Sequence, residues 1–157
     1  MNPAAHPSAG PSAGLSAGSS AVPALLRLGA TAVAAGRVAL GVTALAWPSV
    51  PARPWVGAAA DGPAGQVFGR ALGGRDVALG LGALAALSGP GAGSESATAW
   101  VAAGALSDAI DVAASLASWR ELPGLTRWLV AASAGGAALL GAAGAAAIWQ
   151  DGREALT

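Results

Sequence analysis

The sequence predicts an all-α protein, a bundle of four transmembrane helices with a disordered N-terminal tail. Apolar residues make up 54% of the 157 residues and charged residues only 10%, whereas soluble domains carry about 25% charged residues. Four apolar segments of 22 to 25 residues follow one another, and roughly 20 helical residues cross the hydrocarbon core of a bilayer. Strands are a poor alternative, because alanine and glycine are depleted in strands and no alternation of period two is present.

The chain divides into a tail, a membrane domain and a short polar end. Residues 1–22 are rich in Pro, Ser, Gly and Ala and carry no formal charge, so we expect a disordered tail. No basic residue precedes the first apolar stretch, as a signal peptide would require, so the tail is expected to be retained. The four-helix transmembrane domain is expected over residues 23–149, followed by a polar C-terminal tail over residues 150–157.

The four helices are expected at about residues 23–47, 67–88, 96–119 and 125–149. Pro23 suits the first turn of a helix, and Pro48 ends the first segment. A loop of 19 residues follows, and its four prolines predict irregular backbone. The other two connections are short and contain the glycine and proline residues typical of turns.

Tryptophan placement supports these boundaries independently of hydropathy. Tryptophan prefers the headgroup level of a membrane, where its ring is half apolar and its N–H reaches water. Five of the six tryptophans fall at or near the end of a predicted segment, and we expect them to be interfacial anchors: Trp47, Trp100, Trp119, Trp128 and Trp149.

The basic residues near the segment ends predict an orientation. Four arginines lie in or beside the first and third loops: Arg53, Arg70, Arg120 and Arg127. The opposite side has two: Arg27 and Arg153. The positive-inside rule therefore predicts that the first and third loops are cytoplasmic and that both termini lie outside a cell membrane.

Five ionisable residues lie at membrane depth: Arg37, Arg75, Asp76, Asp108 and Asp111. With a rise of 1.5 Å per residue, all five should lie about 12 to 16 Å from the same membrane surface. Because Asp108 and Asp111 are three positions apart, they share one helix face. A charge at the bilayer centre costs about 2.5–3.5 kcal/mol, so we expect Arg37 and Arg75 to face inward and pair with Asp108 and Asp111. Asp76 should close the network or meet water.

Two interpretations of this layer stay open. It can be a salt-bridge network that fixes the register of the helices, or a site that takes part in the transport of a proton, an ion or a small solute. The layer contains one more aspartate than arginine, which favours a titratable or cation-visited site. The sequence therefore predicts an integral membrane protein held together by the network, with a small transporter as the alternative.

Other functional classes are not supported by the sequence. The net charge is zero, so the basic surface of a nucleic-acid-binding protein is missing. Cysteine is absent and His6 is the only histidine, so we expect no metal or cofactor, and no catalytic motif predicts an enzyme. The expected partner is the lipid bilayer, with a homo-oligomer through Gly/Ala faces such as Gly69-x-x-x-Gly73 as a further option.

The polar pattern resembles that of a known group of proteins. The segments RVALGVTALAWP, GRALGGRDVALGLGAL and GALSDAIDVAASL are similar to those of a family of small four-helix membrane proteins of bacteria, of actinobacterial type, which is distantly DoxX-like. The resemblance covers about residues 30–149, and its most specific part is Gly74 to Asp76 together with Asp108. It implies the fold and a membrane location, with Arg37 and Arg75 also among the polar positions of the family.

Overall fold

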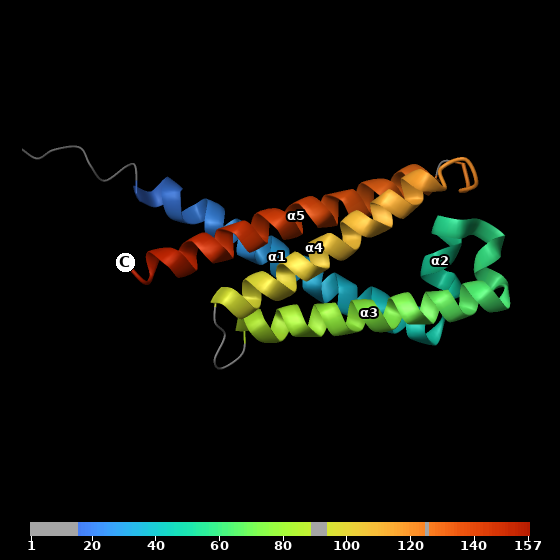
Figure 1. Ribbon diagram of the computed structural model, residues 1–157, viewed down its shortest axis with the longest axis horizontal. Coiled ribbons are helices and arrows are strands. Elements are labelled where there is room, and N and C mark those ends of the chain that lie inside the picture. The colour runs from blue at the N-terminus through green and yellow to red at the C-terminus, as the bar shows by residue number, and fades with distance from the viewer. Residues whose placement is uncertain (1–15, 89–93, 125) are drawn as a thin grey trace, which may run out of the picture.

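The computed structural model describes residues 16–88, 94–124 and 126–157. Within these ranges the chain forms five α-helices, one 3₁₀ helix and no strand, which confirms the all-α prediction (Figure 1). The elements are α1 (Ser16–Ala46), α2 (Ser49–Val56), the 3₁₀ helix η1 (Gly57–Asp61), α3 (Pro63–Ser88), α4 (Ser94–Ala117) and α5 (Thr126–Glu154). The disordered tail expected for the first residues lies, over residues 1–15, outside the described residues.

Four of these helices are long and apolar enough to cross a membrane: α1 over Ala21–Ala46, α3, α4 and α5. Many of their large apolar side chains point outward, and Phe68 and Leu139 are 67% and 75% exposed. An exposed apolar surface of this extent is unfavourable in water but is the surface that lipid requires. The fold is that of a multi-pass membrane protein.

Three helix ends differ from the prediction. Helix α1 begins at Ser16 and not at Pro23, because the small residues before the proline continue the helix and the proline removes only one backbone hydrogen bond. Helix α3 begins at Pro63, where the missing N–H of a proline is not needed. Helix α5 continues to Glu154, so the expected polar tail over residues 150–157 is mostly helical.

The irregular first loop was predicted wrongly, because most of it is helical. Helix α2 occupies Ser49–Val56, where Pro51 falls in the first turn and would lack a hydrogen-bond partner in any case. Pro54 lacks the N–H for one hydrogen bond within the helix, and the packing of α2 against its neighbours tolerates this loss. Gly57 then ends α2 with a φ of 64°, a left-handed conformation that glycine adopts without steric cost.

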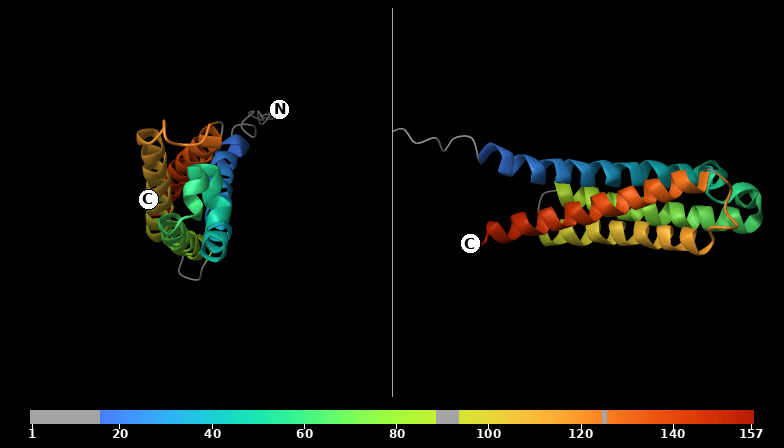
Figure 2. Two further views of the ribbon diagram at one scale, coloured as in Figure 1. Left: turned by 90° about the vertical axis from the view of Figure 1, so that its right-hand side faces the viewer. Right: turned by 90° about the horizontal axis from the view of Figure 1, so that it is seen from above.

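The long helices are arranged as two closely packed pairs. Helix α1 packs along α3, and α4 packs along α5, while α1 also crosses α5 (Figures 1 and 2). The α1–α3 contact is close because Gly41 faces Gly73: a Cβ atom on Gly73 would lie 2.8 Å from the carbonyl oxygen of Gly41. Gly69, one helical turn away on α3, similarly faces Pro48. The Gly69-x-x-x-Gly73 pattern is therefore a contact face within the chain.

The interior changes along the length of the bundle. At the end where α1 begins and α5 ends it is an apolar core that includes Ala30, Ala83, Val101 and Ile148. Helix α2 covers the opposite end, where it contacts α1, α3 and α5 and lies across the middle of the bundle in the end-on view of Figure 2. The charged residues of α1, α3 and α4 lie between these two regions.

Candidate functional site: a charged layer beside a cavity

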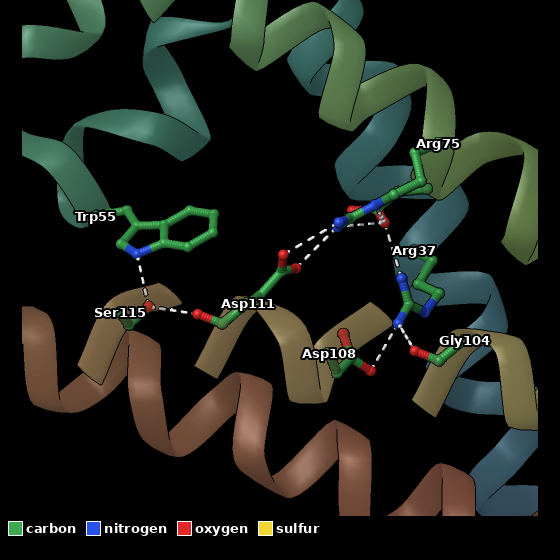
Figure 3. A network of polar contacts seen from close by, with 8 residues as sticks. Arg37, Trp55, Arg75, Gly104, Asp108, Asp111 and Ser115 are labelled. Carbon is green, nitrogen blue, oxygen red and sulfur yellow. Dashed lines mark hydrogen bonds and ion pairs between the residues drawn. The ribbon is translucent and has the colours of Figure 1, made fainter. Parts of the chain in front are cut away.

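The structure brings together all five ionisable residues expected at membrane depth. Arg37 comes from α1, Arg75 and Asp76 from α3, and Asp108 and Asp111 from α4 (Figure 3). Arg37 and Asp108 are buried, each only 8% exposed. All five residues form one continuous network of ion pairs that connects three helices.

Arg37 occupies the centre of this network. Its Nη1 donates a hydrogen bond of 2.8 Å to Oδ1 of Asp76, and its Nη2 donates one of 2.5 Å to the carbonyl oxygen of Gly104. Nη2 also lies 2.6 Å from Oδ2 of Asp108. The guanidinium lies against Gly104, where a Cβ atom would be 3.4 Å from Nε of Arg37, an ordinary van der Waals contact.

Arg75 makes the second half of the network. It binds Asp111 through two parallel hydrogen bonds of 3.0 Å and 2.8 Å, the bidentate geometry that arginine and carboxylate favour. It also donates to Oδ1 of Asp76 from Nε and Nη2, at 3.3 Å and 3.2 Å. The same oxygen of Asp76 thus accepts from both arginines and closes the network, one of the two arrangements expected for this residue.

Asp108 is the least satisfied carboxylate of the network. Its Oδ2 is close to Arg37 but poorly aligned, and among the described residues this buried oxygen has no hydrogen-bond partner. The other carboxylate oxygen points away from Arg37 (Figure 3). A buried oxygen that is paired by charge but not by a hydrogen bond keeps part of its desolvation penalty.

A cavity of about 510 Å³ adjoins the network on the side of α2. All five helices contribute to its lining, which is mainly apolar and includes Leu40, Leu72 and Val130. Arg37, Arg75 and the three aspartates of the network also line it. On the other side of Arg37 there is a void of only about 20 Å³. The charged layer therefore closes the inner end of the cavity.

Helix α2 covers the outer end of the cavity through Trp55, which sequence reasoning did not assign to the site. The indole N–H of Trp55 donates a hydrogen bond of 2.9 Å to Oγ of Ser115. Ser115 in turn donates to the backbone oxygen of Asp111 at 2.7 Å (Figure 3). Ser115 lies one helical turn after Asp111, a spacing visible in the sequence, but nothing in the sequence indicates that a loop tryptophan would meet it.

The expected tryptophan anchors lie near the helix ends and are mostly exposed. Trp47, Trp100, Trp128 and Trp149 range from 40% to 67% exposed. Trp119 packs edge to face against Trp128 with 4.5 Å between ring centroids, and the guanidinium of Arg127 lies 4.9 Å from its ring. These positions suit the headgroup region of a bilayer.

Ion pairs outside the network lie near the two ends of the bundle. Arg27 pairs with Asp151 at 3.1 Å near the termini. Arg53 pairs with Asp61 at 2.8 Å beside α2, and its hydrogen bonds lower the pKa of the exposed Asp61 carboxyl below its usual range. One such pair lies on each side of the bundle, so the difference of two arginines on which the predicted orientation depends is unchanged.

Comparisons with known proteins add no identification. The chain matches no family model, and neither a curated protein nor a solved structure matches it. The resemblance to small bacterial membrane proteins therefore stays a prediction. Within the described part of the chain, no three His, Cys, Asp or Glu side chains come together in a way that could hold a metal ion.

Proposed function

We propose that this chain is a multi-pass protein of the cell membrane in which the charged network joins the α1–α3 pair to α4. One observation carries the proposal: the arginines that bind α4 come from the other helix pair. Arg37 of α1 meets Asp108, and Arg75 of α3 meets Asp111. The two pairs also meet where α1 crosses α5 and where α3 packs against α4. The network adds a charged connection between α1 and α4, which touch each other little.

The energetics of the bilayer support this role. Each charge at the bilayer centre costs about 2.5–3.5 kcal/mol when it is unpaired, so separating α4 from the arginines would expose several charges at once. A shift of α4 by one turn would have the same effect, because Asp108 and Asp111 would lose their partners together. The network therefore favours one register of the helices over the alternatives.

The test compares aspartate substitutions inside and outside the network. Asp111→Asn removes the bidentate partner of Arg75, and Asp151→Asn removes the partner of Arg27 near the termini. We expect Asp111→Asn to lower the yield of folded protein and the free energy of unfolding in mixed micelles, and Asp151→Asn to change both little. Equal effects of the two substitutions would contradict the proposal.

A second candidate function, transport of a small solute, is favoured by the cavity of about 510 Å³ that reaches the charged layer. Ligand pockets commonly have volumes of about 300–1,000 Å³ and combine apolar walls with a few polar groups. The parent protein reconstituted in liposomes would show solute flux, and a variant that fills the cavity would abolish it without loss of folded protein. Absence of flux with a well-folded parent would reject this candidate.

A further inference from the structure

We propose that the cavity binds a small organic monocation with an apolar body, such as an alkyl- or arylammonium ion, with its cationic group beside Asp108. This inference rests on the second candidate function, because it names the class of solute. It depends on four observations: the charge of the layer, the state of Asp108, the walls of the cavity, and the route by which the cavity meets the membrane.

The charge of the layer favours one positive charge. Two arginines and three aspartates line the inner end of the cavity, which leaves one uncompensated negative charge when all are ionised. In a medium of low dielectric constant such a charge is costly unless a cation or a proton neutralises it. An anion would find both guanidinium groups already engaged by carboxylates.

Asp108 is the group to which the cation would bind. It is 8% exposed and lines the cavity, and its Oδ2 is buried against Nη2 of Arg37. Its other oxygen, Oδ1, points away from Arg37 (Figure 3) and accepts no hydrogen bond from a described group. In contrast, both oxygens of Asp111 accept bonds from Arg75. An ammonium N–H beside Asp108 would supply the missing donor and the missing charge together.

The walls of the cavity suit the body of such a ligand. Leu40, Leu72 and Val130 provide apolar surface, and Trp55 adds an aromatic side chain at the α2 end. The hydrogen bond from Trp55 to Ser115 fixes the indole in place. The aromatic ring adds apolar area that the body of the ligand can contact.

The cavity meets the outer surface between α1 and α5. Gly36 and Leu40 on α1 and Ser133 on α5 line the cavity and are also exposed. In a membrane this surface faces lipid, so a ligand that partitions into the bilayer through its apolar body would reach the charged layer from the side. A strongly hydrated metal cation would not follow this route.

The test measures binding to the full chain in lipid nanodiscs by calorimetry, with empty nanodiscs as the baseline. Three probes share a body and differ in charge: phenylbutylammonium, the neutral phenylbutanol and the anionic phenylbutyrate. We expect saturable binding of the ammonium ion alone. Equal binding of the alcohol would show that the cavity takes any hydrocarbon, and binding of phenylbutyrate alone would show an anion site. Either result, or no binding of the ammonium ion, would overturn the inference.

Two variants locate the site. Asp108→Asn should weaken phenylbutylammonium binding by about tenfold or more, as expected for the loss of a charged hydrogen-bond partner, whereas Asp151→Asn should leave it unchanged. Because Asp108→Asn could also impair folding, Ala137→Phe provides a second test. This residue lines the cavity from α5 and is outside the network, so its substitution should abolish binding and leave the unfolding free energy largely intact. Unaltered binding in a folded Ala137→Phe variant would overturn the inference.

The same experiments separate this inference from the functions proposed above. If Asp111→Asn destabilises the protein but phenylbutylammonium does not bind, only the inference about the ligand is overturned. Ammonium binding without flux in liposomes would reject transport and retain the binding site. Ammonium binding in a protein whose stability does not respond to Asp111→Asn would reject the structural role of the network.

Discussion

Arg37 and Asp108 lie 2.6 Å apart in the interior of the bundle and connect α1 to α4, two helices that touch little elsewhere. Both residues are only 8% exposed. Their contact therefore links two helices that have little direct contact with each other, and its removal should weaken the bundle at this level.

Arg37→Met is expected to be strongly destabilising. The methionine keeps the apolar part of the side chain but leaves Asp76 and Asp108 without the positive charge that pairs with both. Breaking a buried ion pair on one side costs about 3–5 kcal/mol. The free energy of unfolding in mixed micelles measures the effect, and Arg27→Met, at an exposed pair, should cost no more than about 1 kcal/mol.

The double variant Arg37→Met with Asp108→Asn should recover part of this loss. Neutralising the aspartate removes the unpaired charge that Arg37→Met creates, so the two effects should not add. The coupling energy from the double-mutant cycle is the relevant quantity. Additive effects would mean that the short distance between the two residues carries no energetic coupling.

Gly73→Ala should destabilise the contact between α1 and α3. An added Cβ atom would lie 2.8 Å from the carbonyl oxygen of Gly41 and 2.9 Å from Cβ of Ala44, and such overpacking costs about 1–3 kcal/mol. The neighbouring Gly74 has nothing within 4 Å of the corresponding position, so Gly74→Ala should stabilise α3 by roughly 0.5–1 kcal/mol. Thermal denaturation of both variants in the same detergent distinguishes the two outcomes.

Ser115→Ala should loosen α2. The substitution removes the acceptor of the Trp55 N–H, a bond of 2.9 Å, and the net cost of one hydrogen bond is about 1 kcal/mol. We expect faster amide hydrogen exchange over residues 49–56 and unchanged exchange in α5. Ser133→Ala is the control, because the exposed Ser133 hydroxyl bonds only within its own helix, to the oxygen of Val130.

The Asp61 carboxyl should titrate below its usual pKa, because Arg53 donates hydrogen bonds to it. Since the pKa is lower in the folded state than the unfolded value of about 3.9, ionised Asp61 stabilises the fold above that pH. This contribution is lost as the pH falls through the folded-state value. NMR titration should show the carboxyl pKa rising toward its usual value in Arg53→Gln, and the exposed pair should respond to salt. An unchanged pKa in that variant would show that Arg53 has no influence.

The spans and the depth of the charges were accessible from the sequence because both follow from local rules. Hydropathy and length locate a membrane helix, and a fixed rise per residue places Arg37 and Asp108 at similar depth. The sequence also predicted that the arginines and aspartates of the layer pair with one another, because a charge buried in a bilayer is unfavourable unless it is paired. The assignment of Asp111 to Arg75 and of Asp108 to Arg37 needed the structure.

Helix α2 and the cavity were not accessible in this way. Proline content predicts where a helix is unfavourable, but Pro51 and Pro54 lie in a short helix that packing against three neighbours stabilises. The cavity is bounded at one end by α2, which lies across the end of the bundle. Trp55 of α2 is held there by a hydrogen bond to Ser115, which is 60 residues away in the sequence. Such contacts depend on tertiary packing and leave no periodic signal.

The neighbouring placement of Arg75 and Asp76 on α3 has a consequence for how the chain enters the membrane during synthesis. When α1 is inserted alone, Arg37 has no described partner within that helix. Helix α3 then brings Asp76, which pairs with Arg37 and also with its own neighbour Arg75. In the charged layer, α1 and α3 together then carry a net charge of one positive unit. The two aspartates of α4 change this net charge to one negative unit. Insertion of α1 and α3 as a joined hairpin therefore avoids the most unfavourable intermediate, and α4 completes the assembly.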